Sequence, residues 1–185
     1  LVGDGTRWMA TLKEGDMLNL VLPLGNGFTL PEDPSVRPLL IGGGVGVAPL
    51  LYLGMKLKEM GITPTFLLGS RTENELMQVQ EFEKVGPVYI TTENGAVGEQ
   101  GYVTQHSVLT REQFSQVYTC GPKPMMVAVA RWAKAADVPC EVSLENKMAC
   151  GVGACLCCVE DTKEGNVCVC KEGPVFSIEK LSWQI

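Results

Sequence analysis

Short apolar runs alternate with longer stretches that are apolar on one side through the middle of the chain. The runs have the length and the polar, glycine or proline boundaries of buried strands, and they lie at 38–41, 65–68, 88–92, 117–120 and 140–144. Residues 49–60 and 123–136 carry apolar side chains at helical spacing, and Thr72 and Glu75 have the spacing of a capping box at the start of another helix. Strands that alternate with helices predict an α/β fold with a doubly wound parallel sheet.

The two ends of the chain follow other patterns. In residues 1–30, short apolar segments are separated by clusters of glycine, asparagine and acidic residues, as at the edge of a β-barrel. Two prolines within 31–34 mark a boundary, and the segment after the last predicted strand is rich in loops and cysteines. We therefore predict a remnant of an N-terminal β-barrel at 1–36, a nucleotide-binding α/β domain at 37–144 and a cluster-binding domain at 145–185.

Composition narrows the class of protein. The chain has 185 residues, a net charge of −6 at pH 7 and an isoelectric point near 4.9. Its length allows one full domain with appendages, and its negative charge argues against nucleic acid or an anionic membrane surface as a partner. The sequence has no signal peptide and no long apolar run, and its clustered thiols, if reduced, favour the cytoplasm.

The cysteines are concentrated in one segment, because six of the eight fall within residues 150–170. Cys150, Cys155 and Cys158 have the C-x4-C-x2-C spacing with which plant-type ferredoxins bind a [2Fe–2S] cluster, and Cys170 is placed to be the fourth ligand. Small residues between the cysteines allow a tight loop whose backbone N–H groups point at the cluster sulfurs. One-electron transfer is therefore the predicted activity.

Zinc and disulfides are the alternative explanations of these cysteines. Structural zinc sites usually use two short cysteine pairs, a spacing that this segment lacks, and disulfide frameworks suit small secreted proteins. Cys157 and Cys168 are not needed for the four-cysteine pattern and are interpreted as spare thiols that line the loop. Cys140 is interpreted as a core residue. His106, the only histidine, has no partner at metal-ligand spacing and is interpreted as a solvated residue near a helix start.

A glycine-rich turn follows the first predicted strand. Gly42, Gly43, Gly44 and Gly46 separate this strand from a helix that has Pro49 in its first turn. Such a turn lets a pyrophosphate approach the backbone, and the N-terminus of the helix stabilises its charge. A glycine turn can also serve only to pack a strand against a helix.

Two further groups of residues follow strands at the same edge of the sheet. The second strand ends in Ser70 and Arg71, where many dinucleotide sites have an acidic residue that holds the ribose hydroxyls. Cys120, Gly121 and Pro122 end a later strand, at a position that could face the nicotinamide. A buried thiol without a chemical role is an equally good explanation of Cys120.

These motifs resemble the ferredoxin-reductase superfamily and, within it, the electron transfer subunits of NAD-linked dihydroorotate dehydrogenases. The resemblance spans nearly the whole chain and is most specific in 143–155 and 169–176. It implies that the four cysteines hold the cluster and that 42–49 and 120–122 bind the pyridine nucleotide. It also implies that FAD is contacted by Gly5 and Thr6 at its pyrophosphate and by Pro23, Leu24, Gly25, Asn26, Gly27 and Phe28 near its flavin.

The cofactors implied by the resemblance are a [2Fe–2S] cluster, FAD and NAD. The family's Arg-x-x-Ser type flavin motif is absent from this sequence, so we expect the first part of the FAD-binding barrel to be missing. Ser70 and Arg71 could bind a 2′-phosphate, because a guanidinium matches phosphate geometry, or Arg71 could stack on adenine. NADP is therefore the alternative nucleotide, with NAD favoured by the family.

The implied function is that of an electron transfer subunit in pyrimidine (UMP) biosynthesis. Electrons would pass from the FMN of a separate dihydroorotate dehydrogenase catalytic subunit through the cluster and FAD to NAD+, in a heterotetramer with two subunits of each kind. No side chain of this chain would act as an acid or base. The alternatives are a small reductase subunit of a sulfide dehydrogenase, ferredoxin:NADP oxidoreductase or hydrogenase, and, from another class, a zinc-containing nucleotide-binding module. Cys150 favours the dihydroorotate branch, because aspartate commonly replaces this cysteine in the sulfide dehydrogenase and ferredoxin oxidoreductase relatives.

Overall fold

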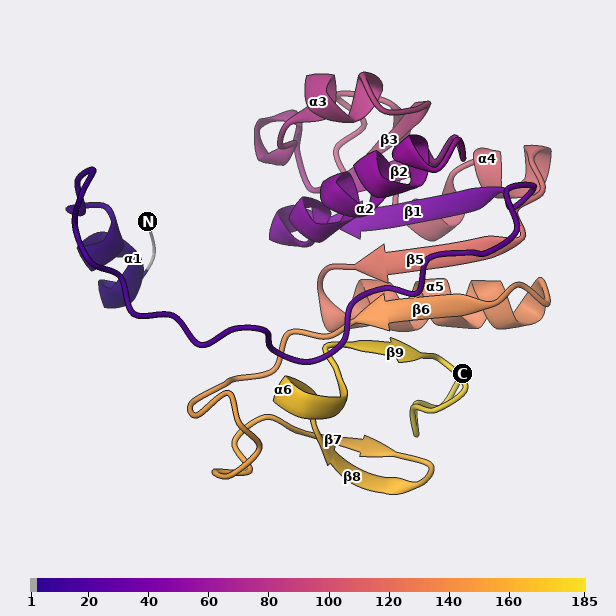
Figure 1. The fold of residues 1–185 in the computed structure, drawn as a ribbon. Helices are drawn as coiled ribbons and strands as arrows, with labels where there is room; N and C mark the ends of the chain where they lie inside the picture. Colours follow the sequence, from indigo (N-terminus) through magenta and orange to yellow (C-terminus); the bar gives the residue numbers. More distant parts are fainter. Residues whose placement is uncertain (1–2) are drawn as a thin grey trace.

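The middle of the chain forms a seven-stranded sheet with helices on both faces (Figure 1). The computed structural model describes residues 3–185. The strands of the sheet are β1 (Pro38–Gly43), β2 (Thr65–Ser70), β3 (Val88–Thr92), β4 (Glu99–Gln100), β5 (Gln116–Cys120), β6 (Cys140–Ser143) and β9 (Val175–Ser177). Their order is β4-β3-β2-β1-β5-β6-β9, and all neighbours are parallel except β6 and β9.

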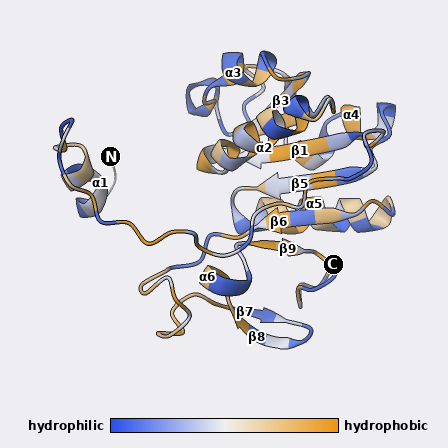
Figure 2. Cartoon of the chain, in the orientation of Figure 1, coloured by the Kyte–Doolittle hydropathy of each residue, from blue (hydrophilic) through white to orange (hydrophobic). Residues whose placement is uncertain are grey.

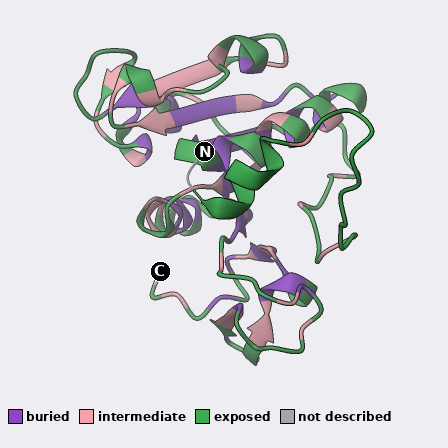
Figure 3. Cartoon of the chain, turned by 90° about the vertical axis from the view of Figure 1, so that its left-hand side faces the viewer, coloured by how far each residue is buried: buried purple, intermediate pink, exposed green. Residues whose placement is uncertain are grey.

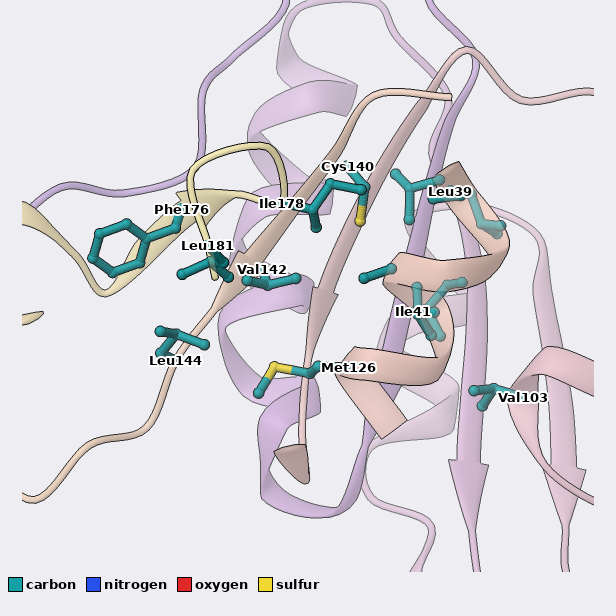
Figure 4. Close-up of a cluster of buried hydrophobic side chains, with 14 of the residues drawn as sticks. Leu39, Ile41, Val103, Met126, Cys140, Val142, Leu144, Phe176, Ile178 and Leu181 are labelled. Atoms are coloured by element: carbon teal, nitrogen blue, oxygen red, sulfur yellow. The ribbon is translucent and has the colours of Figure 1, made fainter. Parts of the chain in front are cut away.

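Two hydrophobic cores lie against the two faces of this sheet. The helices are α2 (Val47–Glu59) and α3 (Val79–Glu83) on one face, and α4 (Val108–Arg111) and α5 (Lys123–Ala135) on the other. Three short 3-10 helices, η1 (Gly44–Gly46), η2 (Glu73–Glu75) and η3 (Val103–Gln105), follow or precede strands. Leu39 and Ile41 point into the core under α5, which Figure 4 shows, whereas Leu40 points into the core under α2.

The predicted doubly wound parallel sheet is confirmed. Because β1 is buried on both faces, it appears in the sequence as an unbroken apolar run, visible in orange in Figure 2. The chain builds β1 to β4 toward one edge and then returns to place β5 on the other side of β1. Such a reversal opens a crevice at the carboxyl ends of the strands, where ligands of these folds bind.

The barrel strands predicted in 1–30 are wrong for the part of this segment that the structure describes; Leu1 and Val2 lie outside it. Residues 4–9 form a helix, α1 (Asp4–Met9), and no strand precedes β1 among the described residues. Apart from a single bridge between Asn26 and Pro174, nothing in 3–185 pairs with this segment. An unpartnered strand leaves its backbone groups unpaired, whereas helix α1 satisfies some of them locally. The segment is largely exposed, as Figure 3 shows in green.

The segment is nevertheless anchored where it reaches the sheet. The Thr29 backbone N–H and hydroxyl donate to the Glu141 carboxylate, at 2.9 Å and 2.6 Å. The buried Tyr118 hydroxyl donates to the Thr29 carbonyl at 2.7 Å, and the Phe28 ring packs edge-on against Tyr118 at 5.4 Å. Residues 28 and 29 therefore have a fixed place beside β5 and β6.

The cysteine-rich segment leaves the sheet after β6 and returns to it as β9. Between these strands lie the hairpin of β7 (Val159–Thr162) and β8 (Gly165–Cys168) and the short helix α6 (Val169–Glu172). Cys158, Cys170, Phe176 and Leu181 belong to the core under α5. The two parts thus share one hydrophobic core.

His106 is buried, so its interpretation as a solvated residue is wrong. Its Nδ1 atom accepts the Val108 backbone N–H at 3.0 Å, at the start of α4, and its ring packs edge-on against Tyr89 at 5.3 Å. Burial lowers the pKa of His106, and Glu99 opposes this shift. The histidine therefore caps a helix and fills the core, whereas Cys140 is a core residue as predicted.

Candidate functional site

A large cavity opens at the carboxyl ends of β1, β2 and β3, next to the first turn of α5. Its volume is about 680 Å³, within the usual range for cofactor sites. Residues predicted to bind the nucleotide account for part of its lining, namely Gly43, Gly44, Ser70, Arg71 and Pro122. The cavity lies where the strand order reverses, so the sheet topology and the predicted residues indicate the same place.

The glycines of the first turn have two different environments. Gly44 has a φ of +55°, and a Cβ atom there would meet nothing within 4 Å, so this residue leaves open the approach to the backbone. A Cβ on Gly42 would instead meet Val47 and Leu50 at 2.9–3.3 Å. Pro49 is exposed in the first turn of α2, as predicted from its missing N–H.

Gly46 packs the glycine-rich turn after β1 against the 120–122 turn after β5. A Cβ on Gly46 would lie 2.5 Å from the Cys120 carbonyl oxygen and 2.6 Å from the Gly121 Cα atom. A Cβ on Gly43 would lie 2.6 Å from the Met125 sulfur in α5. The packing role that a glycine turn can have therefore applies at Gly42 and Gly46, while Gly43 and Gly44 line the cavity.

Cys120 lies beside the cavity without lining it. Its thiol is partly buried, and burial raises its pKa. Gly121 and Pro122 line a second cavity of about 110 Å³, and Pro122 also lines the large one. The other wall of the small cavity includes Asn146 and Glu160, which flank the cysteine loop. The nucleotide turn and the base of the cysteine loop are thus neighbours.

Arg71 is held by Glu75, the residue that the sequence pattern had assigned to a capping box. Residues 73–75 form η2, and Thr72 makes no side-chain cap, so the predicted capping box is wrong. The Glu75 carboxylate instead accepts from Arg71 Nε at 3.2 Å and Nη2 at 2.5 Å. This pairing raises the pKa of Arg71 and lowers that of Glu75. Glu93 lines the same part of the cavity, which therefore carries two carboxylates and one guanidinium.

The rest of the cavity is a slot that sequence reasoning missed. Tyr102 and Val103, at the start of η3, and Pro124 and Met125 of α5 line this part of the cavity. Tyr102 is 62% exposed, which leaves its ring free for a planar ligand. Only the aromatic residue after Gly101 and the apolar first turn of α5 could have indicated this slot.

The cysteine loop brings several thiols close together. Cys150 lies beside Cys155, and both Cys170 and Cys168 lie beside Cys158. The Cys158 sulfur also accepts the Cys170 backbone N–H at 3.4 Å, which lowers the pKa of Cys158. Backbone N–H groups of Val152, Cys155 and Ala154 lower the pKa of Cys150 to about 6.

This geometry fits a [2Fe–2S] cluster, in which each iron takes two thiolates. Gly151 and Gly153 have φ values of +72° and +77°, and this left-handed backbone turns the loop amides inward. Among residues 3–185, no group of three or more Cys, His, Asp or Glu side chains is arranged to hold a metal ion. All eight cysteines are free thiols.

The two extra cysteines differ in position. Cys157 is exposed, whereas the partly buried Cys168 thiol lies 3.8 Å from the Gly153 carbonyl oxygen. Burial and the neighbouring thiols raise the pKa of Cys168. Both Cys168 and Cys170 have a thiol beside Cys158, so the choice of Cys170 as the fourth ligand stays a prediction.

The residues predicted to contact FAD do not converge. Gly5 and Thr6 lie in α1, which Figure 1 shows apart from the sheet and the cysteine loop. Gly25 and Asn26 pack against Gly173, and Phe28 against Tyr118. The described residues thus form at most one edge of a flavin site.

A nucleotide cavity at the switch point of a parallel sheet, beside a loop of clustered thiols, defines a pyridine-nucleotide-linked iron–sulfur oxidoreductase. Family models agree: the iron–sulfur cluster binding domain of dihydroorotate dehydrogenase B matches residues 145–182, and the oxidoreductase NAD-binding domain matches residues 40–131. The chain belongs to the family of dihydroorotate dehydrogenase B electron transfer subunits, as the following relatives establish.

The chain is 44% identical over 183 residues to the dihydroorotate dehydrogenase B (NAD(+)) electron transfer subunit of Caldanaerobacter subterraneus subsp. tengcongensis, a match that covers 97% of this chain and 72% of that one. It is 40% identical to the probable counterpart of Methanocaldococcus jannaschii, over 98% of this chain and 70% of that one. Among solved structures, an NADH-dependent reduced ferredoxin-NADP oxidoreductase is 34% identical with a TM-score of 0.83, covering 99% of this chain and 67% of that one. No helix in 3–185 has the length and apolar character needed to cross a membrane.

The two kinds of glycine can be separated experimentally. We expect Gly46→Ala to destabilise the fold by about 1–3 kcal/mol, because its Cβ would overlap the backbone at Cys120. Gly44→Ala places its Cβ in the cavity, and the positive φ at this position costs the alanine about 1–2 kcal/mol of backbone strain. We expect this variant to weaken NADH binding more than Gly46→Ala does. Thermal unfolding and calorimetric titration with NADH measure both effects. An unchanged unfolding midpoint for Gly46→Ala would contradict the packing of the two turns.

Proposed function

We propose that this chain passes electrons between a [2Fe–2S] cluster on Cys150, Cys155, Cys158 and Cys170 and a pyridine nucleotide in the large cavity. The observation that carries the proposal is that Pro122 lines both cavities, and the smaller one is bordered by the base of the cysteine loop. The two sites are therefore adjacent within one chain. The C-x4-C-x2-C spacing and the match to an iron–sulfur cluster binding domain support a cluster over a single zinc ion.

The nucleotide is proposed to lie along the carboxyl edge of the sheet. Its pyrophosphate would meet Gly43 and Gly44 at the N-terminus of α2, and its adenine would enter the slot that Tyr102 and Met125 line. The nicotinamide would then extend toward the 120–122 turn. No acidic or basic side chain is needed for hydride transfer, so the residues of the chain bind and orient the cofactors.

A flavin supplies the conversion between two-electron hydride chemistry and single-electron transfer. In this proposal, 23–28 forms the edge of the flavin site that this chain contributes. Gly5 and Thr6 lie in α1, apart from this edge (Figure 1), and have no role in the proposal.

The proposed partner is an FMN-containing catalytic subunit of dihydroorotate dehydrogenase, in a complex of two subunits of each kind in the cytoplasm. The relatives support the pairing, since they are named as electron transfer subunits of dihydroorotate dehydrogenase B. The second candidate is a ferredoxin:NADP oxidoreductase subunit, which the 34% identical solved structure favours.

The charges around Arg71 favour NADH over NADPH. A 2′-phosphate would need the Arg71 guanidinium, but Glu75 already binds it through two hydrogen bonds. Glu93 adds a second carboxylate to the same wall. We therefore propose that this wall accepts hydrogen bonds from ribose hydroxyls and repels a phosphate.

The cluster ligands are tested by substitution. In the full-length protein purified without oxygen, we expect about two irons per chain. Cys150→Ser, Cys155→Ser, Cys158→Ser and Cys170→Ser should each abolish or destabilise the cluster, whereas Cys157→Ser, which changes an exposed thiol, should leave the electron paramagnetic resonance (EPR) spectrum nearly unchanged. Loss of the cluster on Cys168→Ser but not on Cys170→Ser would show that Cys168 is the fourth ligand. Stoichiometric zinc without iron would contradict the proposal.

Nucleotide choice is tested at Glu75. Glu75→Gln removes one carboxylate and weakens the hold on Arg71, so we expect the ratio of NADPH to NADH affinity to rise about tenfold or more, the effect of one charge-assisted hydrogen bond. Glu73→Gln, on the same 3-10 helix, is the control, because Glu73 does not line the cavity. Equal affinity ratios in calorimetry for both variants and the parent protein would refute the role of Glu75.

The partner is tested by reconstitution. The full-length protein alone should oxidise NADH with an artificial acceptor and form no orotate, because none of its residues is assigned to proton abstraction. Adding the FMN subunit should give NAD-dependent orotate formation. Orotate production without that subunit, or none from the cluster-replete pair, would overturn this assignment.

A further inference from the structure

Asn26 binds the turn that carries Cys170, although 144 residues separate them in the sequence. Its side-chain amide donates to the carbonyl oxygens of Lys171 at 3.1 Å and Glu172 at 3.2 Å. Its backbone N–H donates to the Gly173 carbonyl at 2.5 Å, and its carbonyl accepts the Val175 N–H at 3.4 Å. One residue thus bonds to the backbone of four residues, from the end of α6 to the first residue of β9.

The C-terminal end of α6 cannot pair all of its own carbonyl groups. Helix α6 is four residues long, and an α-helix of that length leaves its last carbonyls without intrahelical donors. The Asn26 amide supplies two of the missing donors. Gly25 packs so closely that any Cβ there would overlap the Gly173 carbonyl. Residues 25–26 therefore fit closely against this turn, in addition to the hydrogen bonds that Asn26 makes with it.

The orientation of the Asn26 side chain matters for its role. By resemblance, Asn26 is a residue near the flavin, yet its side-chain N–H groups point at Lys171 and Glu172. On the other side of the turn, Cys170 is buried and its backbone N–H donates to the Cys158 sulfur. A movement of α6 would shift this thiol and this N–H together.

We propose that Asn26 is a positioning residue for the cluster. It fixes the C-terminal end of α6 and thereby holds Cys170 beside Cys158. Because it lies within 23–28, it also sets the distance between the proposed flavin edge and the cluster. The inference rests on the proposed ligand set, and it adds a residue outside the cysteine segment to the machinery of the cluster.

The test uses a substitution that keeps the shape of the side chain and removes its donors. In the full-length protein, Asn26→Asp should increase the rate at which a chelator removes iron by about fivefold or more, the effect of losing about two hydrogen bonds. The EPR spectrum of the remaining reduced cluster should change. Asn19→Asp, an equal change of charge at an exposed residue of the same segment, should leave both measurements as in the parent protein.

Asn26→Ala serves as the second variant, because it introduces no charge. It should also accelerate iron release, with the thermal unfolding midpoint of the iron-free protein close to that of the parent. Parental iron release and spectra in both variants would overturn the inference. Iron-free parent protein would instead contradict the proposed cluster, and parental cluster content in Cys170→Ser would contradict the ligand assignment, so the three failures are distinguishable.

Discussion

The pairing of β9 with β6 is the contact on which the arrangement of the two sites depends. Because these strands are neighbours, residues 144 and 174 are joined by a 2.8 Å hydrogen bond, and everything between them is a loop anchored at both ends. Both anchors lie on the sheet that carries the nucleotide cavity. The short β9 can do this because Phe176, Ile178 and Leu181 add to the core under α5. Hydrophobic burial, rather than the few strand hydrogen bonds, keeps the loop in place.

Residues 25–29 lie between the sheet and the cysteine loop and contact both. On one side, Thr29 and Phe28 bind Glu141 and Tyr118, and on the other side Asn26 binds the Cys170 turn. A flavin edge at this position would adjoin both the nucleotide turn and the cluster. This order of sites matches the chemistry, because a flavin is the group that can exchange electrons with both.

The sequence predicted the elements whose signals are local. Buried parallel strands such as β1 are unbroken apolar runs, and the cysteine spacing indicated the loop without knowledge of its surroundings. The strands expected in 1–30 failed because strand formation requires a partner, which a pattern of apolar residues does not supply. His106 and Glu75 were misinterpreted for the same reason: their roles come from Val108, Tyr89 and Arg71, whose positions only the folded chain defines. The division of the glycines into cavity-lining and packing residues likewise depends on where β5 lies.

Backbone N–H groups of the cysteine loop surround the Cys150 sulfur. Three backbone N–H groups lower the pKa of Cys150 to about 6, so this thiol is mostly thiolate at neutral pH. Iron binding requires thiolates, and a site that is already deprotonated releases fewer protons on binding. The same N–H groups would continue to stabilise negative charge on the sulfur once the cluster accepts an electron. The positive-φ glycines at 151 and 153 are what turn these amides inward. If Cys150 is a ligand as proposed, backbone geometry at this loop would therefore favour both cluster assembly and the reduced state of the cluster.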